Sequence, residues 1–148
     1  MISTTIDQEI KKAMLAKDQA QLRGLRAIKA ALLLAKTEKG SGEEITEEVE
    51  SKILQKLVKQ RRESADIYKQ QGREDLSIIE EEEIEVISRF MPKQLEQAEI
   101  ESIIAQIIKD SGAASVKEMG KVIGLANKEL AGKADGKLIA EIVKAQLA

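Results

Sequence analysis

The sequence contains no cysteine, no histidine and no tryptophan, and Tyr68 and Phe90 are its only aromatic residues. These absences exclude disulfide bonds, zinc sites built from cysteine and histidine, thiol nucleophiles and catalytic triads that depend on histidine. The core must therefore be built from aliphatic side chains. We expect no metal, no cofactor and no intrinsic catalysis, because no remaining acid–base pair lies in a motif or an apolar setting that would activate it.

Proline and long apolar runs are also scarce. Pro92 is the only proline, and the longest uninterrupted apolar run, Ala30 to Ala35, has six residues. A membrane span needs about 20. A secretory signal consists of a basic region followed by an apolar stretch, and the first residues do not show this pattern. We therefore expect a protein that does not enter a membrane and that is located in the cytoplasm.

The residues that are abundant predict an all-α fold. Alanine, leucine, isoleucine, glutamate, lysine and glutamine dominate the 148 residues, and no alternation of β-branched residues is visible. Long amphipathic helices are expected up to Pro92, whereas five of the nine glycines follow it. The change predicts two domains: a bundle of long helices over residues 1–92 and a compact tail of three helices over residues 93–148.

Short sequence signals predict where the helices begin and end. Thr5 with Gln8 predicts a capping box for a first helix, and Asp18 can cap a second one, although a single kinked helix fits the same range. Residues 40–42 read as a loop. The later signals are N-caps at Thr46 and Asp135, a capping box formed by Ser115 and Glu118, left-handed helix stops at Gly72 and Gly112, and a helix opening at Asp75.

Charge is arranged in blocks that the net charge of −2 conceals. Seven basic and two acidic residues lie between Lys52 and Arg73, and seven acidic residues with no basic one lie between Glu74 and Glu85. Two interpretations remain open: a footprint for a phosphate backbone, or pairing with an acidic helix that folds back and whose Glu80–Glu83 run masks the cations. Helical spacing places the following residues on one face, here called the basic stripe: Lys52, Lys56, Lys59, Arg62, Lys69 and Arg73.

The tail places small residues beside lysines at the predicted helix edges. Glycine lets another backbone approach closely, and free amides at the start of a helix attract phosphate. Tight packing between helices, with a helix stop at Gly132, explains the same spacing. The segment is not a nucleotide-binding loop, because the GxxxxGK[ST] pattern is absent and no strand precedes it.

Several segments, taken together and in order, go beyond composition. They are Leu25-Arg26-Ala27-Ile28-Lys29-Ala30-Ala31-Leu32, Val58-Lys59-Gln60-Arg61-Arg62-Glu63-Ser64, Gly72-Arg73-Glu74-Asp75-Leu76, Phe90-Met91-Pro92-Lys93-Gln94-Leu95, Met119-Gly120-Lys121-Val122 and Gly132-Lys133-Ala134-Asp135-Gly136-Lys137-Leu138. This combination resembles the YqeY-like family, which is related to the carboxy-terminal region of the B subunit of the tRNA-dependent amidotransferase. The resemblance covers nearly the whole chain.

The resemblance implies a helical domain and a tail joined near Pro92, and a tail that helps to hold tRNA. In the amidotransferase the catalytic region lies in another domain, so the family label of carbon–nitrogen ligase with glutamine as amido donor implies association with that reaction. The matching tail residues are Gly120, Lys121, Lys128, Gly132, Lys133, Ala134, Asp135, Gly136 and Lys137, of which Asp135 reads as a helix cap and the glycines and lysines as RNA contacts.

Two kinds of partner follow from these observations. The first is tRNA, read by its backbone and shape, because the chain lacks aromatic residues for stacking on unpaired bases. The basic stripe is a possible extension of that contact. The alternative is an interaction adaptor that docks an aminoacyl-tRNA synthetase or an amidotransferase without binding RNA directly.

Overall fold

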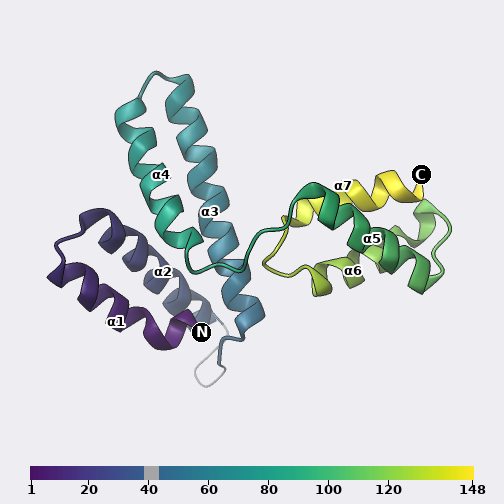
Figure 1. Ribbon diagram of the computed structural model, residues 1–148, viewed down its shortest axis with the longest axis horizontal. Helices are drawn as coiled ribbons and strands as arrows, with labels where there is room; N and C mark the ends of the chain where they lie inside the picture. Colours follow the sequence, from purple (N-terminus) through teal and green to yellow (C-terminus); the bar gives the residue numbers. More distant parts are fainter. Residues whose placement is uncertain (39–43) are drawn as a thin grey trace. The chain divides into compact units, whose positions relative to one another are not determined.

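The computed structural model describes residues 1–38 and 44–148, and the loop expected at residues 40–42 lies outside them. The described residues form helices and no strand, so the all-α fold class is confirmed (Figure 1). The elements are α1 (Ile2–Leu15), α2 (Gln19–Glu38), α3 (Glu47–Gln70), α4 (Glu74–Ser88), α5 (Gln97–Ser111), the 3₁₀ helix η1 (Val116–Glu118), α6 (Met119–Glu129) and α7 (Gly136–Leu147).

The helices belong to two compact units, which we call unit 1 (Met1–Met91) and unit 2 (Pro92–Ala148). Unit 1 contains α1 to α4, and unit 2 contains α5 to α7 together with η1. Each unit has its own cluster of buried aliphatic side chains. The independent folding of the two predicted domains stays a prediction.

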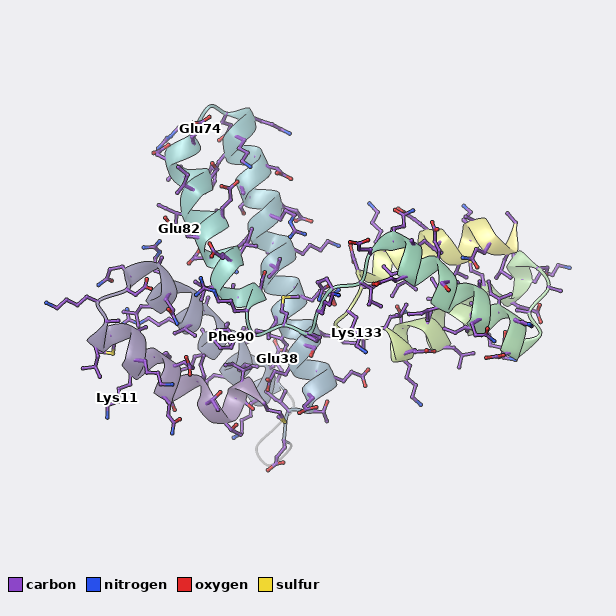
Figure 2. The ribbon with its side chains drawn as sticks, in the orientation of Figure 1. Lys11, Glu38, Glu74, Glu82, Phe90 and Lys133 are labelled. Carbon is purple, nitrogen blue, oxygen red and sulfur yellow. The ribbon has the colours of Figure 1, made fainter. Side chains whose placement is uncertain are left out.

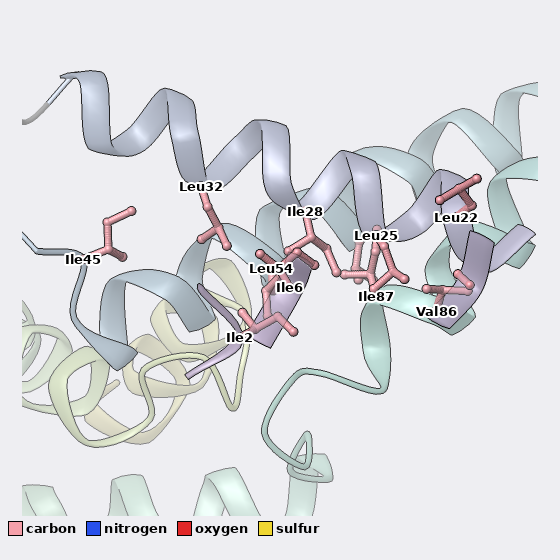
Figure 3. Packing of buried hydrophobic residues seen from close by; sticks show 12 residues of the cluster. Ile2, Ile6, Leu22, Leu25, Ile28, Leu32, Ile45, Leu54, Val86 and Ile87 are labelled. Atoms are coloured by element: carbon pink, nitrogen blue, oxygen red, sulfur yellow. The ribbon is translucent and has the colours of Figure 1, made fainter. Parts of the chain in front are cut away.

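Unit 1 consists of two helical hairpins, α1–α2 and α3–α4, and helix α4 packs against both α2 and α3 (Figure 1). Leu25, Ile28 and Ile87 are completely buried where the hairpins meet (Figure 3). Helices α2 and α4 approach closely, since a Cβ atom built on Gly24 would lie 2.7 Å from Cγ1 of Val86. A glycine at this position therefore sets the distance between the two hairpins.

The break between α1 and α2 is confirmed, and a single kinked helix is not formed. Lys17 adopts a left-handed conformation with φ 54°. The amide of Asp18 donates to the carbonyl of Ala13 at 3.1 Å, which is the closing bond of a Schellman motif. Asp18 then caps the next helix, because its Oδ1 accepts from the amide of Gln21 at 3.1 Å.

The capping box expected at Thr5 is wrong, because α1 already begins at Ile2. The amides of Ile2 and Ser3 donate instead to the two carboxylate oxygens of Glu50, at 2.6 and 3.4 Å. Glu50 lies in the first turn of α3 and is only 6% exposed. A side chain from another helix thus satisfies the first amides of α1, and this removes the need for a local cap.

Most of the other helix boundaries follow their local signals. Thr46 accepts from the amide of Val49 at 3.2 Å, and Asp135 accepts from that of Lys137 at 3.3 Å. Gly72 and Gly112 both have φ 72°, which confirms them as left-handed stops. The opening expected at Asp75 lies one residue earlier, at Glu74.

Unit 2 packs three helices around a buried aliphatic core that includes Ile104, Val122 and Val143. The capping box expected at Ser115 is wrong: the Ser115 side chain makes no capping bond, and a short 3₁₀ turn follows instead. The Glu118 carboxylate accepts from the amide of Ala114. This pairing turns the chain tightly before α6 without the serine hydroxyl.

Candidate nucleic-acid interface

Two cations of α3 pair with the acidic helix α4: Lys69, which belongs to the basic stripe, and Arg61, which does not. Arg61 Nε lies 3.6 Å from the Glu83 carboxylate, and both side chains are largely buried, at 18% and 15% exposed. Lys69 pairs with Glu81 at 2.5 Å, and this hydrogen bond and charge raise the pKa of Lys69. Acidic residues of α4 therefore neutralise part of the positive charge of α3, as one of the two interpretations of the sequence expected.

Other cations of unit 1 are also engaged by carboxylates. Lys52 pairs with Glu48 on its own helix at 3.2 Å. The Arg73 guanidinium hydrogen bonds to Asp75 and thereby lowers the pKa of that carboxyl. Among the remaining residues of the stripe, Lys56, Lys59 and Arg62 are exposed.

The same pattern extends to α2, whose Arg23 binds the Glu82 carboxylate of α4 at 2.7 Å; Glu82 is labelled in Figure 2. The acidic run on α4 thus joins both neighbouring helices by ion pairs. Among the described residues, no group of three or more acidic side chains is arranged to hold a metal ion. Pairing within unit 1 therefore explains Glu81, Glu82 and Glu83.

The lysines of unit 2 have a different environment from those of unit 1. Lys121 and Lys128 are exposed on α6, and Lys133 and Lys137 are exposed in the turn before α7 and at its start (Figure 2 for Lys133). Within residues 92–148, all of which are described, no ion pair joins a lysine to a carboxylate of the same unit. Unit 2 therefore presents cations that its own carboxylates do not neutralise.

Gly120 is exposed on α6, and helical spacing places it on the same face as Lys121 and Lys128. No atom of a neighbouring residue lies within 4 Å of a Cβ built on Gly120, so packing between helices does not explain this glycine. Gly124, one helical turn later, has the same open surroundings. Gly124 is not among the matching family positions. Its spacing of four residues from Gly120, which places the two glycines on one helix face, is the sequence signal that could have identified it as a candidate. Gly136 is also exposed, with Asn127 Oδ1 3.9 Å from a built Cβ.

Gly132 differs from the other candidate residues because it is buried. Its φ of 75° ends the turn after α6, and its carbonyl accepts from Nε2 of Gln94 at 2.7 Å. The amide of Leu95 donates in the same way to the carbonyl of Lys133 at 3.0 Å. Gly132 therefore helps to hold the first residues of unit 2 against the α6–α7 turn. We assign Gly132 a positioning role, because a buried residue is not available for direct contact with RNA.

No helix in residues 1–38 and 44–148 has both the length and the apolar stretch that crossing a bilayer requires.

Residues 3–147 match the protein family described as "Yqey-like protein". A curated protein of the yeast Clavispora lusitaniae, "Altered inheritance of mitochondria protein 41, mitochondrial", is 36% identical over 88 residues. The aligned part is 60% of this chain and 50% of the relative, so the chain spans about half the length of that relative.

Proposed function

Because the chain belongs to the YqeY-like family, we propose that it binds tRNA without acting on it chemically, through the exposed lysine and glycine surface of unit 2. The contact residues are Gly120, Lys121, Lys128, Lys133, Gly136 and Lys137, joined by Gly124. The proposal rests on the resemblance to the tail of the amidotransferase B subunit and on the environment of these side chains. The relative's name places that protein in mitochondria, where tRNA is also present, so the proposal holds for either compartment.

The observation that carries the proposal is the contrast between the cations of the two units. Carboxylates of unit 1 engage Arg23, Arg61 and Lys69, and cations that are already paired release few counterions when a nucleic acid binds. The exposed lysines of unit 2 have no such pairs within their unit. Phosphate contacts of this kind position folded RNA and report its shape.

The glycines of α6 add a second argument. A glycine inside a helix costs about 0.5–1 kcal/mol relative to alanine, and nothing within unit 2 approaches Gly120 or Gly124 closely enough to require one. A partner whose backbone approaches the helix gives a reason for both. The ribose–phosphate chain of an RNA is such a partner, because its phosphates can reach Lys121 and Lys128 on the same helix.

The decisive test is fluorescence anisotropy of labelled deacylated tRNA at about 50 and about 200 mM salt. We expect saturable binding that weakens steeply with salt. Changing Lys121, Lys133 and Lys137 to Gln should weaken binding and lower the salt slope by up to about three. The matched control removes the same charge from three other exposed lysines of unit 2, Lys93, Lys109 and Lys144, and should change affinity much less.

The G120A/G124A variant separates binding from folding. Alanine meets no neighbour at either position, so the free energy of unfolding should rise by about 0.5–1 kcal/mol per site. Affinity for tRNA should fall nevertheless, because two methyl groups hold the RNA away from the helix. Unchanged affinity in both this variant and the lysine variant contradicts the proposed site, and absence of binding at either salt contradicts the proposed function.

A further inference from the structure

A small apolar groove lies within unit 1, between α1 and α2. Ile6, Leu32 and Ile45, which belong to the buried core (Figure 3), line this groove and, because they are buried, form its floor. Leu33 and Lys36 of α2 stand at its edge, and Leu33 is 56% exposed. The groove has a volume of about 170 Å³, below the range of about 300–1,000 Å³ typical of small-molecule sites. Its size suits one aliphatic side chain of a partner.

Among the described residues, one carboxylate and two lysines line the groove. The carboxylate, Asp7, is already held by Lys29 at 2.6 Å. Lys36 lines the same groove, is exposed, and forms no ion pair with a residue that the structure describes. Helix α2 carries four basic residues, and its single acidic residue is Glu38, the last one of the helix. A ligand that fills the apolar floor is therefore favoured if it also brings a negative charge to Lys36.

We infer that this groove docks an acidic segment of a partner protein, in which an aliphatic side chain fills the floor and a carboxylate one helical turn away pairs with Lys36. RNA carries the negative charge but no aliphatic group to bury in the floor. A membrane surface favours a broad apolar face, whereas this floor is recessed and narrow. A short amphipathic protein segment combines both features. This inference is independent of tRNA binding by unit 2.

The neighbouring Leu34 provides a matched control for testing the inference. Leu33 and Leu34 are both more than half exposed, at 56% and 62%, but only Leu33 lines the groove. The full-length chain labelled with ¹⁵N is titrated with three twelve-residue helical peptides in an alanine and glutamine background. The first carries leucine and glutamate three residues apart, the second has lysine in place of the glutamate, and the third has serine in place of the leucine.

The first peptide should shift the amide signals of Ser3, Leu33 and Lys36 and bind with a Kd below about 1 mM. Leu33→Ser should weaken it at least fivefold, and Leu34→Ser less than twofold. Lys36→Glu should reverse the preference, so that the lysine peptide binds better than the glutamate peptide. Because these positions are exposed, the variants should keep the spectrum of the folded chain.

Three outcomes overturn the inference. They are the absence of shifts at 2 mM of the first peptide, an equal response to all three peptides, or equal losses for Leu33→Ser and Leu34→Ser. A fourth comparison assigns the groove to another class of partner. If Lys36→Glu instead abolishes binding of the chain to vesicles of phosphatidylcholine and phosphatidylglycerol, or to tRNA, and leaves the peptides unaffected, the surface recognises lipid or RNA rather than protein.

Discussion

At the scale of single residues, the most informative side chain is Glu50. Its hydrogen bond to the amide of Ile2 joins α3 to α1 and spans 48 positions of the sequence. The carboxylate is buried and accepts from two amides that would otherwise lack partners. A buried amide without a partner costs about 1–3 kcal/mol. No local sequence pattern reveals such a contact. For this reason the prediction from sequence wrongly placed the start of α1 at Thr5.

Glu50→Ala should lower the free energy of unfolding by about 1–3 kcal/mol, because it leaves the buried amide of Ile2 without an acceptor. Glu50→Gln keeps one acceptor oxygen and should lose less. Urea denaturation followed by circular dichroism measures both changes. The control is Glu48→Ala in the same turn of α3, whose exposed pair with Lys52 should contribute at most about 0.5 kcal/mol. Equal stability of the Glu50→Ala and Glu48→Ala variants contradicts the role of Glu50.

At the scale of secondary structure elements, the boundaries that could be predicted are those determined by neighbouring residues. The Thr46 hydroxyl and the left-handed Gly72 act within a few residues of themselves, so a single sequence is enough to identify them. The pairing of α4 with α3 could be expected as one alternative from the opposite charges. Two features could not be predicted, because they depend on three-dimensional packing. They are the register that joins Arg61 to Glu83 and the contacts that α4 also makes with α2.

Helix α4 also contains a carboxylate in an unfavourable position. Partial burial, and then the charge of Glu83, raise the pKa of Glu80 above its ordinary value of 4.5, against the opposing effect of Arg61. A raised pKa means that the folded state holds the proton more tightly than the unfolded state. The resulting stabilisation is complete below about pH 4.5 and is lost as the pH rises through the pKa of the folded state.

Glu80→Gln should therefore stabilise the chain at pH 7, by about 0.2–0.5 kcal/mol, because it removes a negative charge that partial burial and the charge of Glu83 both disfavour. The advantage should disappear below about pH 4, where Glu80 is protonated in both states. Thermal unfolding at pH 7 and pH 4 measures the difference. Glu82→Gln is the matched control, since it breaks the pair with Arg23 and should destabilise at pH 7. A gain for Glu80→Gln that is equal at both pH values contradicts this explanation.

At the scale of the whole molecule, the two units use charge differently. Residues 92–148 contain eight lysines and eight acidic residues, so the net charge of −2 belongs to unit 1. The identity of the candidate lysines could be predicted from the family motif. The exposure of these lysines and the burial of Gly132 could not be predicted, because both depend on how the helices of unit 2 pack in the folded chain.

The separation of the two buried clusters leads to a last prediction, that unit 2 folds alone. A domain of about 60 residues buries only about 60% of its unfolded surface, so residues 92–148 should unfold cooperatively but at low stability. Circular dichroism of the fragment should show a helical spectrum and one thermal transition. The fragment should also bind tRNA with the salt dependence of the full chain if unit 2 alone carries the contact.

The Ile104→Ala variant supplies the control, because this side chain is completely buried in unit 2. Loss of its packing costs about 2–5 kcal/mol, which is enough to unfold a marginal fragment. In the full chain the same change should remove the transition of unit 2 and leave that of unit 1 at its original temperature. A single transition of the full chain that shifts as a whole shows instead that the two units fold together. In that case the lysine surface depends on unit 1 for its structure.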